Sequence, residues 1–198
     1  MRAPATRLLP VLLMGAMLTL AACGGPSGKG GPSTLPTAAN PVTLTGGSTT
    51  LALDPQTAGV LEDNQVTISA VAPARLKSDA LTFPITTGRI DGTSLGGSFA
   101  HTGGLRISSD VASVVLRNLS ANTISRQVTA EIGTGRLPVF DLDQRQLSGR
   151  APARRLNASG LVALLSPGAA HQLNAALKVS IFTPKLIIGD VSVDASTG

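Results

Sequence analysis

The chain has 198 residues, a formal net charge of +5 and 42% hydrophobic residues, with two histidines, one cysteine, four phenylalanines, and neither tyrosine nor tryptophan. Nucleic-acid-binding surfaces interleave basic clusters with aromatic side chains, so this composition argues against a nucleic-acid partner. A single cysteine excludes an intramolecular disulfide, and the length allows one domain with a sizeable core.

The first 22 residues have the anatomy of a lipoprotein signal peptide. Arg2 and Arg7 form a basic start, and residues 8–20 are an apolar run that is short for a membrane-spanning helix. The run ends in LAAC, which resembles the bacterial lipobox, where the cysteine is lipidated and cleavage occurs just before it. We therefore predict that Cys23 is the lipidated first residue of an extracytoplasmic protein, anchored to the cell membrane or, in a host with two membranes, the outer membrane. The alternatives are a secreted protein with one free cysteine or an uncleaved anchor helix.

Two further segments follow the signal peptide. Residues 23–41 are rich in Gly, Pro and Ser without a hydrophobic period, which predicts a flexible tether. Residues 42–198 are predicted to form one folded domain. Its one basic cluster, GRAPARR at 149–155, is typical of a solvated loop, although it could also rest on anionic lipid headgroups.

Short apolar runs dominate the predicted domain. Each has four to nine residues, is rich in Val, Ile, Leu and Thr, and is bounded by Gly, Asn, Asp or Pro. This pattern predicts an all-β, mainly antiparallel domain, either a two-sheet sandwich or an open barrel. The expected strands are 48–54, 65–71, 80–85, 97–101, 105–108, 113–121, 127–132, 137–143, 161–165, 178–182 and 185–193.

Two stretches instead predict short α-helices. In LDPQTAGVLEDN, Asp54 is placed to cap the N-terminus, Pro55 to occupy the first helical position, and Asn64 to end the helix. LSPGAAHQLNAALK repeats the arrangement with Ser166 and Pro167, followed by Ala and Leu residues at spacings of three and four.

Catalytic and metal-site patterns are weak. GTSLG at 92–96 satisfies the G-x-S-x-G expression, and Asp141 and His171 follow Ser94 in hydrolase order, but the Gly-rich sequence after Ser94 disfavours the helix that a nucleophile elbow needs. Asp141 and Asp143 share a strand face and could meet a cation, yet solvated carboxylates explain them as well. We expect neither an enzyme nor a resident metal.

His101 is the more promising residue for binding. It lies at a predicted strand end before Gly103 and Gly104, where the backbone can approach a ligand closely. Phe99, two residues earlier, belongs on the same strand face. The alternative is a turn histidine that bonds a neighbouring carbonyl. His171 falls off the apolar stripe of its helix and should be exposed.

The order of segments resembles the HtaA domain, a β-rich envelope module used in bacterial haem uptake. LTFPITTGRIDGTSLGGSFAHTGGLRISSDVASVVLRNLSANTI, then VFDLD, then LSPGAAHQLNAAL carry the resemblance, which covers residues 48–193. In haem-binding members a tyrosine from the early helix ligates the iron and a histidine from the turn supports that tyrosine. The resemblance assigns the histidine to His101, whereas this chain has no tyrosine.

Two functions follow as expectations. The first is a non-catalytic envelope lipoprotein with an HtaA-like scaffold and a structural or protein-interaction role. The alternative is a protein that binds haem or another apolar ligand in a pocket formed near His101 by Phe99, Gly103 and Gly104. Every methionine lies in the signal peptide, so only the two histidines could hold iron, with His101 the candidate. The expected partners are the membrane, through the lipid, and either such a ligand or an envelope protein.

Overall fold

The computed structural model describes residues 40–151 and 154–198, so the predicted signal peptide, Cys23 and all but the end of the tether lie outside the described residues. The described residues belong to one compact unit. Neither helix in the described part has the length and apolar character needed to cross a membrane.

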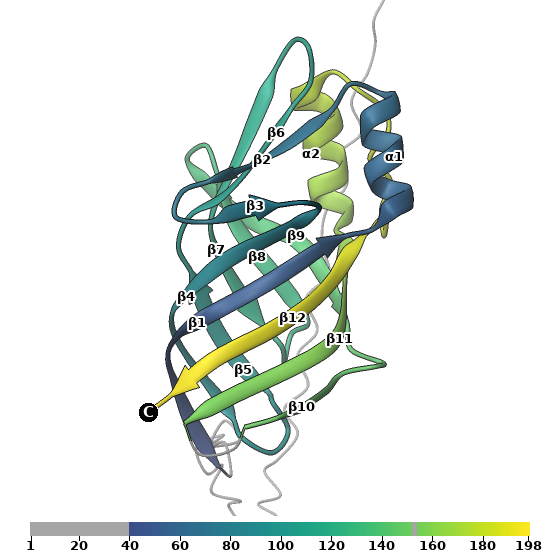
Figure 1. Cartoon of the computed structure of the whole chain (residues 1–198). Helices are drawn as coiled ribbons and strands as arrows, with labels where there is room; N and C mark the ends of the chain where they lie inside the picture. Colours follow the sequence, from purple (N-terminus) through teal and green to yellow (C-terminus); the bar gives the residue numbers. More distant parts are fainter. Residues whose placement is uncertain (1–39, 152–153) are drawn as a thin grey trace, which may run out of the picture. The chain divides into compact units, whose positions relative to one another are not determined.

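Eight antiparallel strands form a closed barrel (Figure 1). The pairing of β7 with β8 joins the two ends of this sheet and closes the barrel. The order around the barrel is β1-β12-β11-β9-β8-β7-β5-β4. These strands are β1 (Pro41–Leu53), β4 (Ala80–Asp91), β5 (Gly97–His101), β7 (Ser113–Asn122), β8 (Gln127–Ile132), β9 (Gly135–Asp143), β11 (Arg155–Leu165) and β12 (Ile187–Thr197).

Four shorter strands extend the barrel wall. β6 (Gly104–Ser108) pairs with the first half of β7, and β2 (Thr67–Val71) pairs with β6, so the two form a ribbon at one end of the barrel (Figure 1). β3 (Arg75–Lys77) pairs with β4, and β10 (Ser148–Arg150) pairs with β11.

Two helices lie at the same end as the ribbon (Figure 1). In α1 (Pro55–Asp63), the Asp54 side chain accepts a hydrogen bond from the Thr57 amide at 2.9 Å. In α2 (Pro167–Leu177), the Ser166 hydroxyl accepts one from the Ala169 amide at 3.2 Å. Both N-terminal caps are those that the sequence predicts, because a capping side chain and the following proline act locally.

One predicted strand is wrong. Residues 178–182 form no strand. Phe182 is instead held by the Asn174 side chain of α2, which accepts from the Phe182 amide at 3.0 Å and donates to its carbonyl at 2.8 Å. A side-chain amide therefore satisfies the backbone groups that a neighbouring strand would otherwise take. The prediction of an all-β, mainly antiparallel domain with two short helices is confirmed, and its sheet closes into a barrel.

Alternating residues of the barrel strands point inward and form one core. On β4, Leu81, Phe83 and Ile85 are buried at every second position, as a strand with one covered face requires. Phe99 and His101 continue this inner surface on β5. The strand period therefore places the histidine of the turn inside the barrel.

Candidate functional site

The site is built where β7 changes partners. Its residues 113–117 pair with β6, and its residues 120–122 pair with β5. Asn118 and Leu119 lie between the two ladders, where the β7–β8 register also shifts. Asn118 has a left-handed backbone with φ of 49°, a conformation that asparagine tolerates better than most residues. We call Asn118 and Leu119 the branch point.

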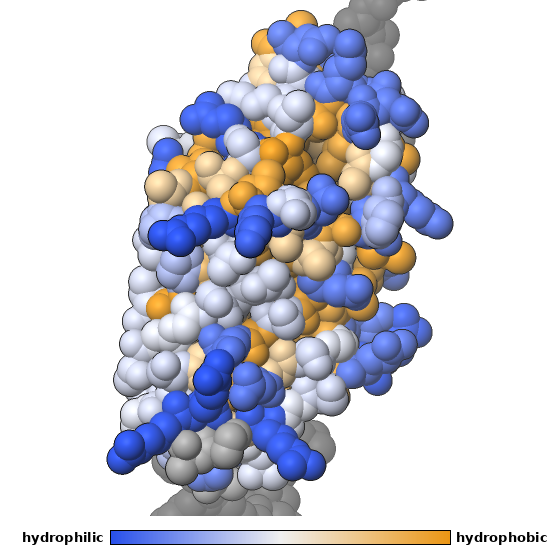
Figure 2. Space-filling view, in the orientation of Figure 1, coloured by the Kyte–Doolittle hydropathy of each residue, from blue (hydrophilic) through white to orange (hydrophobic). Residues whose placement is uncertain are grey.

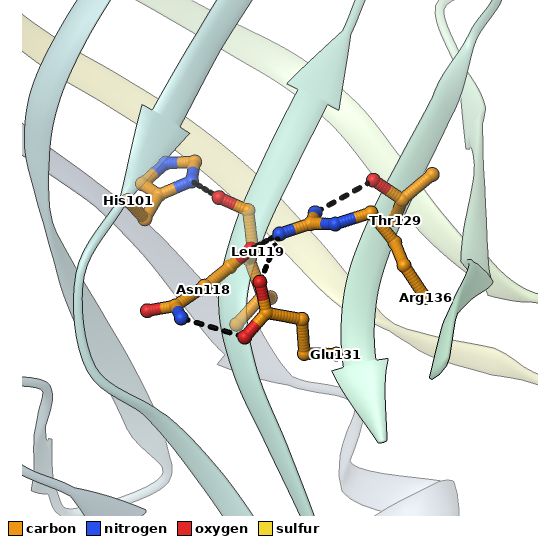
Figure 3. Close-up of polar contacts among 6 residues, drawn as sticks. All are labelled: His101, Asn118, Leu119, Thr129, Glu131 and Arg136. Carbon is orange, nitrogen blue, oxygen red and sulfur yellow. Dashed lines mark hydrogen bonds and ion pairs between the residues drawn. The ribbon is translucent and has the colours of Figure 1, made fainter. Parts of the chain in front are cut away.

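His101 bonds the branch point from inside the barrel. Its Nδ1 lies 3.1 Å from the Leu119 carbonyl oxygen, and its Nε2 lies 2.7 Å from Thr49 Oγ1 on β1 (Figure 3 draws the Leu119 contact). A carbonyl can only accept, so Nδ1 carries the proton and Nε2 accepts from the Thr49 hydroxyl. Both ring nitrogens are therefore used, and the imidazole donates to Leu119 in the gap between the two ladders.

The surroundings of His101 favour its neutral form. The residue is only 6% exposed, and its ring contacts those of Phe83 and Phe99 edge to face, with centroids 6.2 and 5.3 Å away. Burial lowers the pKa of His101 to about 4, and the hydrogen bond to Leu119 opposes this only in part. His101 is therefore uncharged at neutral pH.

A polar network fixes the branch point from outside (Figure 3). Arg136 donates to the Asn118 carbonyl and to Glu131 Oε1, both at 2.9 Å, and to Thr129 at 3.1 Å. Asn118 Nδ2 donates to Glu131 Oε2 at 2.7 Å. The Asn118 amide, followed by Arg136, holds the pKa of Glu131 below its usual value. This network could not be predicted from the sequence, because nothing in a single sequence places residues 118, 131 and 136 together.

The space beside His101 is small. An interior cavity of about 40 Å³ lies against His101 and three phenylalanines, Phe83, Phe99 and Phe140. This volume accommodates about one water molecule. No buried side-chain nitrogen or oxygen of the described residues lacks a hydrogen-bond partner. A haem does not fit here: the cavity is too small for a macrocycle, and neither imidazole nitrogen is free to ligate iron.

Close packing of the backbone requires glycine at positions 103 and 104. Gly103 has φ of +82°, and a Cβ there would lie 2.6 Å from the Ala74 amide nitrogen. A Cβ on Gly104 would lie 1.9 Å from the Leu116 carbonyl oxygen of β7. The space that these glycines leave is filled by the chain itself.

A second cavity, of about 30 Å³, lies between the ribbon and the helices. It is lined almost entirely by apolar side chains, among them Ile68, Leu105, Leu173 and Phe182. Figure 2 shows hydrophobic side chains on the same part of the surface, over the region between β2, β3 and α1.

The GTSLG turn has a structural explanation. The Asp91 carboxylate accepts from the Ser94 amide at 2.7 Å, the Ser94 hydroxyl at 2.9 Å, and the amides of Asn40 and Thr93 at 2.9 and 3.0 Å. These hydrogen bonds, led by the Ser94 and Asn40 amides, hold the pKa of Asp91 well below its usual range. Ser94 thus closes the β4–β5 turn at one end of the barrel. His171 is exposed on α2, which lies at the opposite end (Figure 1).

One member of the aspartate pair on β9, Asp143, has a local partner. Asp143 accepts from Arg145, and this contact lowers the pKa of Asp143. Among the described residues, no three or more His, Cys, Asp or Glu side chains are grouped to hold a metal ion.

No family model and no curated protein matches the sequence. The C-terminal domain of HtaA from Corynebacterium glutamicum superposes with a TM-score of 0.61 at 14% identity, over 79% of this chain and 99% of that one. A histidine-to-alanine variant of that domain, a domain-swapped dimer, gives 0.53 at 15%, over 72% and 91%. The heme-binding protein HtaB of the same organism gives 0.48 at 8%, over 80% and 96%. The described domain therefore has an HtaA-like fold, as the order of its sequence segments predicts.

Proposed function

We propose that this chain is a non-catalytic, lipid-anchored extracytoplasmic protein whose HtaA-like domain serves as a structural or protein-interaction module. In this proposal His101 stabilises the barrel and binds no haem. The observation that carries it is the hydrogen bonding of both imidazole nitrogens, to Thr49 and Leu119, in an interior with room for about one water.

The composition of the chain supports the same proposal. Haem iron is held by histidine, cysteine, methionine or tyrosine side chains. The described residues contain only His101 and His171 from this set. His171 is exposed on α2 and has no enclosing pocket around its ring among the cavities described above. Ligation by His101 would require breaking a hydrogen bond inside the barrel wall.

A haem or other apolar ligand near His101 is the second candidate. Phe83, Phe99 and Phe140 favour it, because large apolar side chains line binding pockets for such ligands. It would require the barrel interior to expand far beyond its present volume. The two candidates therefore make opposite predictions for a haemin titration.

We expect haemin titrated into residues 36–198 to give no saturable Soret shift that depends on His101. The visible spectrum is recorded for the parent domain, for His101→Ala and for His171→Ala as the matched exposed control. Weak haemin uptake of equal size in all three is the expected result. A one-to-one Soret shift in the parent and the His171→Ala variant that His101→Ala abolishes would establish the second candidate instead.

The lipid anchor has its own test. Cys23 is the only cysteine, and it occupies the position that the lipobox requires. We expect the full chain to sediment with membranes and Cys23→Ser to move to the soluble or secreted fraction. Retention of Cys23→Ser in the membrane fraction would contradict lipidation.

A further inference from the structure

We propose that the barrel end opposite the helices docks directly on an anionic lipid bilayer. This inference rests on the lipid anchor proposed above, because the anchor would hold that end near a membrane. The docking end is defined by the starts of β1 and β11, the end of β12, the turns that join β4 to β5 and β7 to β8, and the segment from the end of β9 through β10, which the Thr123 and Arg126 carbonyls and the start of β11 hold at this end. Strand register places these together: Pro41 pairs with Asp91, Ser98 with Asn122, and Arg155 with Ser196.

The described chain begins at the docking end. The backbone amide of Asn40 donates to the Asp91 carboxylate at 2.9 Å, which fixes the first described residue to the β4–β5 turn. Cys23 precedes Asn40 by 17 residues. A fully extended segment of this length spans at most about 60 Å. A lipid on Cys23 would therefore keep the docking end within that distance of the bilayer.

The positive charge of the domain is concentrated at the docking end. Six arginines and four aspartates lie there, whereas the remaining described residues carry seven basic and seven acidic side chains. Hydrogen-bonded ion pairs engage two of the six, Arg145 with Asp143 and Arg155 with Asp194. The other four are exposed and have no such ion pair among the described residues: Arg89, Arg126, Arg150 and Arg154.

The acidic groups at this end do not cancel that charge. Asp91 is enclosed by its turn, and Asp143 and Asp194 are held by arginines. Asp143 also feels the charge of Arg126 at longer range. Asp141 is half-buried and is the one aspartate of this end without a hydrogen bond or ion pair given above. Figure 2 shows hydrophilic side chains gathered at the lower end of the molecule, near the C-terminus marked in Figure 1.

An apolar side chain projects beside these arginines. Ile124, in the β7–β8 turn, is 75% exposed, the highest value among the large hydrophobic residues of the described chain. The turn is well ordered: Asn122 Oδ1 accepts from the amides of Ile124 and Ser125 at 2.9 Å, and buried Thr123 donates to the Leu95 carbonyl at 2.8 Å. Arg126 follows two residues later. An exposed aliphatic side chain flanked by arginines matches the boundary between acyl chains and anionic headgroups.

Vesicle sedimentation of residues 36–198 tests the proposal. The vesicles contain either phosphatidylcholine alone or phosphatidylcholine with phosphatidylglycerol at about three to one. We expect binding to the anionic vesicles that weakens when salt is raised, since exposed charges are screened. Each arginine near the surface contributes roughly fivefold to affinity. Ile124→Ser combined with Arg126→Gln and Arg150→Gln should therefore reduce binding by at least about tenfold.

A variant with the same chemistry at the other end is the matched control. Val111 is 73% exposed at the tip of the β6–β7 turn, and Arg75 and Lys77 lie on β3. Val111→Ser with Arg75→Gln and Lys77→Gln should leave vesicle binding within about twofold. Absence of binding to anionic vesicles, or an equal loss in this control, would overturn the proposal. The protein in this assay lacks Cys23, so its result is independent of lipidation, which Cys23→Ser tests in the full chain.

Discussion

The free energy of unfolding of the domain should fall by about 3 kcal/mol as the pH is lowered from 6.5 to about 4, because His101 is buried in its neutral form. The unfolded chain binds a proton at the ordinary histidine pKa of 6.5, whereas the folded protein binds it only near pH 4. Between these values the unfolded state holds more protons, so stability decreases as pH falls and the loss is complete below about 4. Urea unfolding of residues 36–198 at a series of pH values measures it.

The chain has two histidines, so a substitution at each of them provides the controls for this pH dependence. His171 is exposed on α2, so His171→Gln should leave the loss of stability unchanged. His101→Gln replaces the titrating ring with an uncharged amide and should remove most of the loss between pH 6.5 and 5, whatever its stability at neutral pH. A parent domain whose stability is flat over that interval would contradict a buried neutral His101.

Gly104→Ala should destabilise the domain by at least about 3 kcal/mol, the range of severe overpacking. Its Cβ would lie 1.9 Å from the Leu116 carbonyl oxygen and 3.0 Å from the Arg117 Cα, and both are backbone atoms of β7. Relief would need the ribbon to move away from β7, next to the branch point. Thermal and urea unfolding of the variant measure the cost.

Gly59→Ala is the matched control for Gly104→Ala. Gly59 lies within α1, and a Cβ there would meet no atom within 4 Å. Alanine is favoured over glycine in a helix by about 1 kcal/mol, so this variant should be as stable as the parent or more stable. Equal losses of stability in both variants would mean that the close approach of β6 and β7 does not cause the destabilisation of Gly104→Ala.

The parts of the fold that could be predicted are local. Asp54 before Pro55 and Ser166 before Pro167 identify both helix starts, because a cap needs only residues within one turn. Apolar alternation identifies most strands for the same reason. It fails at residues 178–182, where the sequence has strand character but Asn174 takes the hydrogen bonds of Phe182.

The site depends on contacts that the sequence could not reveal. His101 and Phe99 share a strand face by the period of two, but Thr49 lies 52 positions from His101 and Leu119 lies 18. The decisive feature is the branch point, which exists because β7 pairs with β5 and β6 in succession and Asn118 adopts a left-handed backbone. Turn composition predicts neither feature, so a histidine two residues before a Gly-Gly pair suggested a ligand site.

The protonation state of the His101 ring tests the central claim most directly. Long-range ¹H–¹⁵N NMR spectra of residues 36–198 contain two imidazoles, and the His171→Gln variant assigns them. We expect His101 to be protonated at Nδ1 alone and to keep that state as the pH is lowered to about 5, with titration near 4. A proton on Nε2, or titration with the ordinary pKa near 6.5, would contradict a histidine locked between Thr49 and Leu119 and would reopen His101 as a ligand.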